Sequence, residues 1–160
     1  MLRDLAKECK SVTEMGVRYI VSTWAFVEGL NGGKLTSIDI KHPSFYGADI
    51  TLIEKACEEK GIDFKFIEAS TLDITIEKTD LLFIDTLHTY DQLKAELKLH
   101  ADKANKYIVL HDTESCPEMW PAVEELIATK KWKIKNRYTH NNGVTVLEKC
   151  SVPRSTKVKA

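Results

Sequence analysis

Short apolar runs alternate with amphipathic stretches along most of the chain, and this alternation predicts a parallel sheet covered by helices. Helices are expected where apolar residues recur every three or four positions, and strands where they run together or alternate. The predicted helices are Leu2–Cys9, Thr23–Leu30, Asp49–Lys60, Tyr90–Ala104 and Pro121–Thr129. The predicted strands before the last helix are Ser11–Met15, Lys34–Ile40, Asp63–Ile67, Asp80–Asp85 and Tyr107–Leu110.

Local signals indicate where several of these elements begin and end. Ser22 is a natural N-cap for the second helix, and Gly29 with Asn31-Gly32-Gly33 favours its termination. Thr89 and Gln92 have the spacing of a capping box, which predicts the start of the fourth helix.

The pattern changes after the last predicted helix. Trp132–Tyr138 and Val144–Glu148 alternate in polarity, and Asn142-Gly143 between them is typical of a tight turn, which predicts a β-hairpin. The predicted fold class is therefore α/β: a Rossmann-like, mostly parallel twisted sheet with helices on both faces and a C-terminal antiparallel β-hairpin. We expect one domain over residues 1–150 and a flexible basic tail over residues 151–160.

Composition limits the binding partners and the cellular compartment that can be expected for the protein. The 160 residues include 23 Lys and Arg and 24 Asp and Glu, and a net charge of −1 argues against a nucleic-acid partner held by a general positive field. The N-terminal residues are too polar for a signal peptide, and no apolar run approaches the roughly 20 residues that cross a membrane. Four widely spaced cysteines predict reduced thiols in a cytoplasmic protein: Cys9, Cys57, Cys116 and Cys150.

Polar residues and a glycine gather at the carboxyl ends of the predicted strands, where ligands bind in open α/β sheets. In chain order they are Glu14, Gly16, Ser22, Asp39, Glu68, Ala69, Ser70, Asp85, His88, His111, Asp112 and Thr113. Gly16 has no Cβ to hold a ligand away from the backbone, and the helix that opens at Ser22 offers free N–H groups to a carboxylate or phosphate. We expect these groups to surround one pocket.

Asp39 follows Gly16 by 23 residues and ends the next predicted strand. An acid at about this distance accepts hydrogen bonds from ribose hydroxyls in nucleotide-binding folds. The alternative is an aspartate that caps a helix or a turn.

Two aspartates and two histidines end the next pair of strands. Asp85 and Asp112 could share a divalent cation, because hard cations prefer carboxylate oxygens, or they could cap turns without a metal. His88 and His111 are candidate general bases, because imidazole titrates near neutral pH, and the alternative for each is a structural hydrogen bond.

Three runs of these residues resemble a known family. Thr13–Arg18 with Val21–Trp24 resembles the first motif of class I S-adenosylmethionine-dependent methyltransferases, and the branch it is most similar to is the small one related to cephalosporin hydroxylase and macrocin O-methyltransferase. Asp80–Tyr90 resembles the fourth-strand signature of that branch, and Tyr107–Thr113 resembles its fifth-strand ending. The resemblance spans residues 12–148 and includes the closing hairpin.

The resemblance implies methyl transfer from S-adenosylmethionine to a small hydroxylated acceptor. The cofactor-binding residues it implies are Glu14, Gly16, Val17, Arg18, Ser22, Asp39, Ile40, Ala69, Ser70 and Asp85. Asp39 would hold the ribose and Ser70 would border the adenine. His88, His111 and Asp85 would be catalytic, and Asp85 with Asp112 would hold Mg²⁺ in a metal-dependent member.

Two departures from the family pattern leave other functions open. A second glycine is missing from the first motif, and Ile20 in that stretch could narrow the cofactor loop; His111-Asp112 stands where metal-dependent members carry two acids. One alternative is a non-catalytic cofactor-binding or interaction domain. Another is a nicotinamide-dependent oxidoreductase, which should carry GxGxxG after the first strand. The small chain could also complete its pocket as a homodimer.

Overall fold

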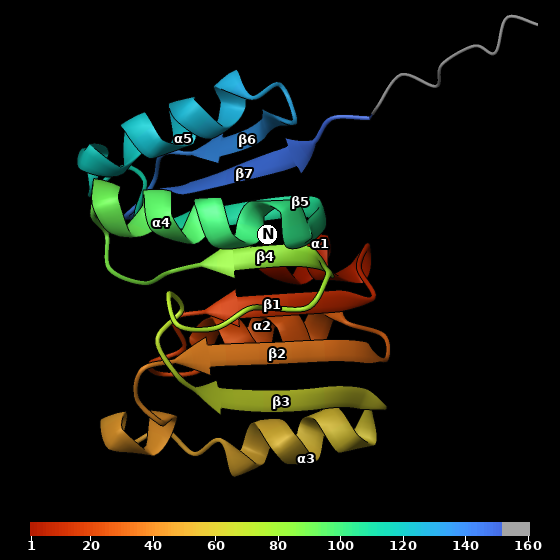
Figure 1. The fold of residues 1–160 in the computed structure, drawn as a ribbon. Helices are drawn as coiled ribbons and strands as arrows, with labels where there is room; N and C mark the ends of the chain where they lie inside the picture. Colours follow the sequence, from red (N-terminus) through yellow and green to blue (C-terminus); the bar gives the residue numbers. More distant parts are fainter. Residues whose placement is uncertain (152–160) are drawn as a thin grey trace, which may run out of the picture.

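Seven strands form one sheet in the order β3-β2-β1-β4-β5-β7-β6, in a computed structural model that describes residues 1–151 (Figure 1). The strands are β1 (Ser11–Met15), β2 (Gly33–Asp39), β3 (Ile62–Glu68), β4 (Thr79–Ile84), β5 (Ala104–His111), β6 (Trp132–Tyr138) and β7 (Val144–Lys149). Residues 152–160 of the predicted tail lie outside the described residues.

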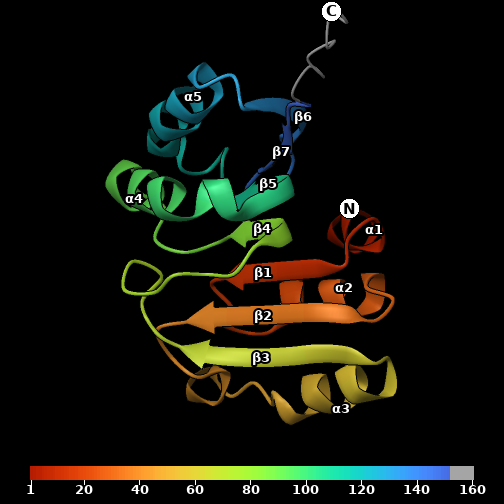
Figure 2. The same cartoon turned by 45° about the vertical axis from the view of Figure 1, so that its right-hand side comes forward.

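Strands β1 to β5 are parallel, whereas β7 runs antiparallel between β5 and β6. The strands also rotate progressively along the sheet, as the two views in Figures 1 and 2 make clear. The predicted fold class is confirmed, including the closing hairpin. The chain order reverses between β1 and β4, which is where an open sheet of this kind forms its ligand crevice.

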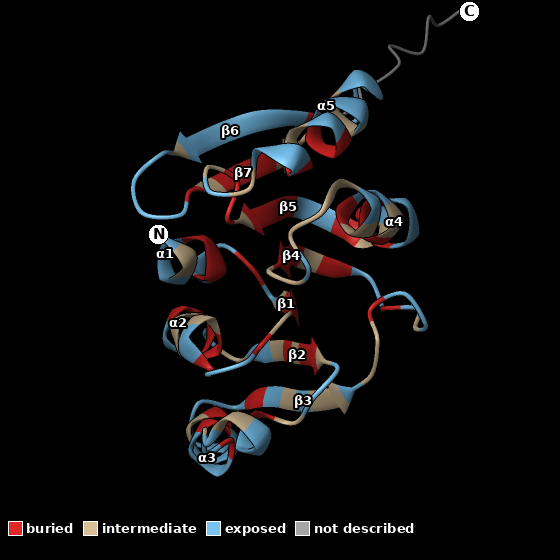
Figure 3. Cartoon of the chain, turned by 90° about the vertical axis from the view of Figure 1, so that its left-hand side faces the viewer, coloured by how far each residue is buried: buried red, intermediate tan, exposed pale blue. Residues whose placement is uncertain are grey.

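Helices cover both faces of the sheet (Figure 3). They are α1 (Leu2–Lys7), α2 (Val21–Gly29), α3 (Thr51–Glu59), α4 (Tyr90–His100) and α5 (Trp120–Ala128), with short 3₁₀ turns η1 (Pro43–Tyr46), η2 (Ala101–Lys103) and η3 (Pro117–Met119). The first three helices bury Leu5, Phe26 and Ile53 in one core, and α4 and α5 bury Leu93 and Val123 in a second core on the opposite face. These two apolar layers hold the strand ends that carry the candidate site.

Most predicted elements agree with the structure to within one or two residues at each end. The fourth helix is the exception, because α4 ends at His100 and the chain continues through η2 into β5, which starts at Ala104 rather than Tyr107. Ala101 keeps the helical spacing of buried residues through the 3₁₀ turn, so the pattern alone does not reveal where the α-helix stops. The predicted cap at Thr89 is confirmed, since its side chain accepts from the Gln92 amide.

The predicted N-cap at Ser22 is wrong. Helix α2 begins two residues earlier than predicted, at Val21, and its N-cap is Ile20, which has left-handed backbone angles (φ 58°, ψ 19°) and provides no side-chain cap. The Ser22 hydroxyl instead donates to Glu14 Oε1 at 2.5 Å.

The structure also bears on the predictions about membrane spans and cysteines. Over residues 1–151, none of the helices is both long enough and apolar enough to cross a membrane. Cys9, Cys57, Cys116 and Cys150 are all free thiols, as their spacing indicates.

Candidate functional site

A cavity of about 760 Å³ lies at the carboxyl ends of the central strands. Four of the predicted residues open onto it together: Gly16 after β1, Asp39 at the end of β2, Asp85 after β4, and Asp112 after β5. The volume is within the range of pockets that hold a cofactor-sized ligand. The expected shared pocket is therefore present for these four residues.

The cavity lining includes most, but not all, of the other predicted residues. Val17, Arg18, Ser22, Ile40, Ser70, His88 and His111 line it. Glu14, Glu68, Ala69 and Thr113 are not among the lining residues. Lining residues that the sequence analysis missed include Thr71, Thr86, Gln92 and Asn142. Thr86, Gln92 and Asn142 belong to patterns that predict a strand end, a helix start and a turn rather than a pocket, and Asn142 reaches the cavity from the distant hairpin turn.

The neighbouring strand leaves no room for a side chain at position 16, so packing alone requires a glycine there. Its φ is +86°, and a Cβ at this position would lie 1.9 Å from the carbonyl oxygen of Asp85. The Gly16 amide donates to the carbonyl of Ile38 on the other side, at 2.9 Å. The loop after β1 is thus held between the ends of β4 and β2, and only glycine fits there.

Gly16→Ala is expected to lower the free energy of unfolding by about 2–3 kcal/mol, because it combines a left-handed backbone with a backbone clash. Urea denaturation measures this loss. Gly47→Ala is the matched control, since Gly47 has a similar φ of +79° but no described atom within 4 Å of an added Cβ. Equal losses in the two variants would contradict the steric role of Asp85.

Asp39 organises the loop that surrounds the cavity. Its Oδ2 accepts from the backbone amides of Val17 at 2.8 Å and Arg18 at 3.0 Å, and its Oδ1 accepts from the amide of Lys41 at 3.1 Å. Asp39 is therefore a turn-stabilising aspartate, the alternative left open by the sequence. Its carboxylate also faces the cavity, where Oδ1, with one protein donor, can accept more hydrogen bonds.

Ile20 does not narrow the loop after β1, a possibility that the sequence leaves open. Its φ of 58° is the left-handed conformation that the missing glycine would adopt easily. This backbone turns the Ile20 side chain away from the cavity and into the core formed with α1, α2 and α3, where it is 7% exposed. The loop thus leaves the cavity open, at the cost of a strained β-branched residue.

Glu14 is fully buried under the same loop. Its Oε2 accepts from Thr23 Oγ1 at 2.9 Å and from Ser37 Oγ at 2.6 Å, in addition to the bond from Ser22 to Oε1. Burial raises the pKa of Glu14 to about 7, although the three hydroxyl donors oppose this change. Glu14 thus connects β1 to α2 and β2 beneath the cavity.

The pKa of Glu14 predicts a loss of stability as the pH rises. A carboxyl whose folded pKa lies near 7 and whose ordinary value is 4.5 binds more protons in the native state between these values, so the free energy of unfolding falls across that interval. The fall is at most roughly 3 kcal/mol. Urea denaturation of wild type and Glu14→Gln from pH 5 to pH 8 should give a flatter profile for the variant. Parallel profiles would contradict the assignment.

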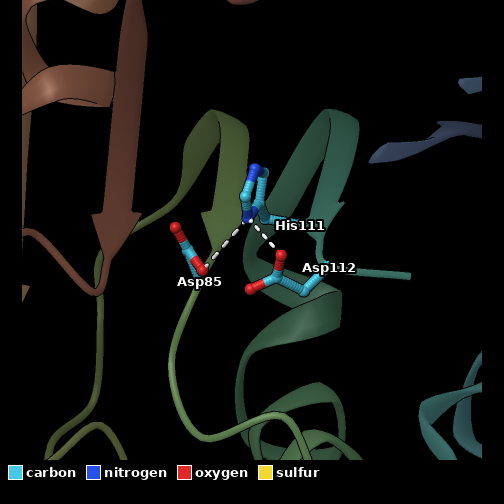
Figure 4. Close-up of side chains that lie close together, drawn as sticks. All are labelled: Asp85, His111 and Asp112. Atoms are coloured by element: carbon cyan, nitrogen blue, oxygen red, sulfur yellow. Dashed lines mark ion pairs between the residues drawn. The ribbon is translucent and has the colours of Figure 1, made fainter. Parts of the chain in front are cut away.

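The two aspartates and two histidines form one cluster. His88 Nε2 lies 3.0 Å from Asp85 Oδ1 and 2.9 Å from Asp112 Oδ2. His111 Nδ1 lies 3.4 Å from Asp85 Oδ1 and 3.2 Å from Asp112 Oδ1 (Figure 4). This nitrogen is buried but makes no well-directed hydrogen bond to either carboxylate. Each imidazole therefore lies against both carboxylates, and His111 Nδ1 still has bonding capacity.

Asp85 and each of the two histidines of this cluster shift each other's pKa values toward the charged forms. Burial opposes ionisation of Asp85, but the two neighbouring imidazoles outweigh it and lower the pKa of Asp85 to about 2. The Asp85 carboxylate, in turn, raises the pKa of His88 through its hydrogen bond and raises the pKa of His111 as well. Without another ligand, these contacts favour the ionised form of Asp85 and the protonated forms of the two imidazoles.

Three members of the cluster also form a candidate cation site. Asp85, His111 and Asp112 each offer a ligand atom, and these atoms lie within 4.8 Å of one another. Two carboxylate oxygens and one imidazole nitrogen are a donor set that divalent metals accept. These donors fit a cation. The sequence predicts only Asp85 and Asp112 as its ligands, and the structure adds His111 as a third.

Comparison with known proteins gives structural relatives but no sequence relatives. No family model matches the sequence, and neither does any curated protein. A protein of known structure from Corynebacterium glutamicum is 16% identical, with a TM-score of 0.74 over 96% of this chain and 80% of that one. The Bacillus cereus O-methyltransferase, solved with S-adenosylhomocysteine, is 15% identical, with a TM-score of 0.67 over 93% and 79% of the two chains.

A third solved structure, the O-methyltransferase TomG from Streptomyces achromogenes in complex with S-adenosylmethionine, is 16% identical, with a TM-score of 0.68 over 94% of this chain and 78% of that one. At these identities the similarity establishes the fold, and it agrees with the motifs noted in the sequence. The chain therefore has the fold of the class I S-adenosylmethionine-dependent methyltransferases.

Proposed function

We propose that the protein is an S-adenosylmethionine-dependent methyltransferase that acts on the hydroxyl of a small molecule. The observation that carries the proposal is the shared cavity of Gly16, Asp39, Asp85 and Asp112. Such a cavity has room for a nucleoside cofactor beside an acceptor. The four free thiols agree with a reducing compartment, so we also propose a cytoplasmic location.

The residues around the cavity fit the parts of the cofactor. Helix α2 has no side-chain cap, so its first amides are available to the methionine carboxylate beside Val21 and Ser22. The Asp39 carboxylate accepts from the ribose hydroxyls, with Ile40 beside it, and Ser70 borders the adenine. The bound cofactor supplies an activated methyl group, and the protein aligns the donor with the acceptor and excludes water.

The acceptor hydroxyl must also lose its proton. His88 and His111 are the candidate bases, since both line the cavity and imidazole can take up a proton near neutral pH. Asp85 and Asp112 both contact Nε2 of His88 and stabilise the charged form of its imidazole after the transfer. Of the two histidines, His88 has the better directed contacts, and we assign it the role of base.

A divalent cation, proposed as Mg²⁺, would be held by Asp85 and Asp112, with His111 as a third donor. A bound cation would lower the pKa of the acceptor hydroxyl. We expect MgCl₂ to raise the thermal unfolding midpoint of the wild type, because a ligand that binds only the native state stabilises it. Asp85→Asn should abolish this rise. A midpoint that does not respond to Mg²⁺ in either protein would contradict the metal site.

Calorimetric titration with S-adenosylhomocysteine tests the proposed cofactor, and NAD⁺ serves as the comparison ligand for the oxidoreductase alternative. We expect S-adenosylhomocysteine to bind and NAD⁺ not to bind. Incubation with labelled S-adenosylmethionine and a panel of small hydroxylated acceptors then separates an enzyme from a binding domain. Binding of the cofactor without transfer to any acceptor would favour the non-catalytic alternative.

A further inference from the structure

A second buried carboxylate, Glu96 on α4, lies directly behind one wall of the cavity. Its Oε1 accepts from Thr71 Oγ1 at 2.6 Å and from Gln92 Nε2 at 2.9 Å, and its Oε2 accepts from Thr86 Oγ1 at 2.8 Å. Glu96 is completely buried and does not line the cavity, whereas its three partners all do. One turn further along α4, His100 Nε2 lies 2.7 Å from the carbonyl oxygen of Thr71. Helix α4 thus holds three wall residues from behind.

These bonds determine which polar atoms the wall presents. A carboxylate only accepts hydrogen bonds, so Glu96 draws the hydroxyl hydrogens of Thr71 and Thr86 and the amide nitrogen of Gln92 toward itself. The same Gln92 nitrogen also donates to Thr71 Oγ1 at 3.4 Å, so Glu96 and Thr71 offer acceptors for both of its hydrogens. Gln92 Oε1 accepts no hydrogen bond from the described residues. The amide orientation therefore leaves this carbonyl oxygen as a free acceptor on a residue that lines the cavity, in a wall without charged side chains of its own.

The wall is also next to the residue assigned to the ribose. The amide of Ala69 donates to the carbonyl of Asp39 at 2.9 Å, and Ser70 and Thr71 follow directly. A nucleoside whose ribose binds Asp39 can therefore place its base against Ser70, Thr71 and Gln92. A neutral heterocycle suits this uncharged surface, and an exocyclic amine on that base would donate to the Gln92 oxygen.

We propose that Gln92 is a specificity-determining residue that recognises the amine of a 6-aminopurine, and that Glu96 is the positioning residue that fixes the Gln92 amide for this contact. The proposal rests on the proposed function, because it takes the cavity to hold a nucleoside cofactor. A 6-oxopurine would bring a carbonyl oxygen against the Gln92 oxygen, and two acceptors cannot pair. By fixing the orientation of the Gln92 amide, Glu96 thus determines the preference for a 6-aminopurine over a 6-oxopurine.

The test compares the affinities of S-adenosylhomocysteine and its 6-oxo analogue, S-inosylhomocysteine, by calorimetry. We expect wild type to bind the adenosyl ligand about tenfold more tightly or better, the effect of one unpaired buried hydrogen-bonding group. Gln92→Met removes the acceptor and should bring the two affinities close together. Glu96→Leu frees the Gln92 amide to turn its N–H toward the 6-oxo group, so this variant should also lose the preference.

Glu14→Gln is the matched control, because Glu14 is equally buried and also accepts from three side chains. It should change both affinities by the same factor and leave their ratio unchanged. If Glu96→Leu does not fold, Gln92→Met, at a half-buried position, still tests the contact. Tight but equal binding of both ligands by wild type would overturn this proposal and leave the cofactor assignment intact. If Glu96→Leu keeps the wild-type ratio of the two affinities, the positioning role of Glu96 is overturned. Failure of wild type to bind S-adenosylhomocysteine would overturn both.

Discussion

Replacing Asp39 with alanine is expected to weaken binding of S-adenosylhomocysteine by about two to four orders of magnitude. The substitution would remove the carboxylate proposed to accept two charge-assisted hydrogen bonds from the ribose, each contributing about 1.5–3 kcal/mol. It also releases the amides of Val17 and Arg18, so the loop after β1 loses its anchor. Calorimetric titration gives the change in affinity, and thermal unfolding shows how much of it accompanies a loss of stability.

Two further variants separate these contributions of Asp39. Asp39→Asn keeps an oxygen for Val17 and Arg18 but loses the charge, so it should retain most of the stability while still binding the ligand weakly. Glu68→Ala is the control: Glu68 pairs with Asp39 across the β2–β3 ladder but lies outside the cavity. Wild-type affinity in Asp39→Ala would remove the ribose assignment.

His88→Gln is expected to reduce the turnover number by about 10²–10⁴, the usual contribution of a positioned general base. Cofactor affinity should stay near that of wild type, because the role assigned to His88 concerns the acceptor proton. Single-turnover transfer from labelled S-adenosylmethionine measures the rate once an acceptor has been found. The exposed His140 on the hairpin turn provides a control in His140→Gln, and His111→Gln tests the second candidate base.

The pH dependence gives an independent test of His88. Its hydrogen bond to Asp85 raises its pKa above the ordinary value of 6.5, and only the neutral imidazole can accept a proton. Turnover should therefore increase as the pH rises through this raised pKa. Asp85→Asn removes the negative charge that stabilises the imidazolium and should move the increase to lower pH. An unchanged pH profile in this variant would mean that another group limits the rate.

The sequence predicts the parts of the fold that depend on local pattern. Buried strands such as Leu81–Ile84 are continuous apolar runs, and strand ends converge in any parallel sheet, so Asp39, Asp85 and Asp112 can be placed at one edge before the structure is known. The hairpin follows from alternation and a turn signal.

Contacts between distant segments are harder to predict. Glu96 is buried although it is charged, and its three partners come from two loops and the previous turn of α4, so no spacing reveals the network. From the sequence, the bulk of Ile20 could narrow the loop after β1, because nothing in the residue pattern gives the direction of its side chain. Its left-handed backbone sets that direction, and sequence periodicity carries no information about such angles.

The insertion of β7 between β5 and β6 has a consequence for how the protein is made. Until residues 144–149 have left the ribosome and docked, β5 is an open sheet edge, although it already carries His111 and leads into Asp112. Exposed edges of this kind invite pairing with other chains. Docking of β7 thus protects the newborn polypeptide from aggregation, and a chain truncated before residue 144 would yield an insoluble product.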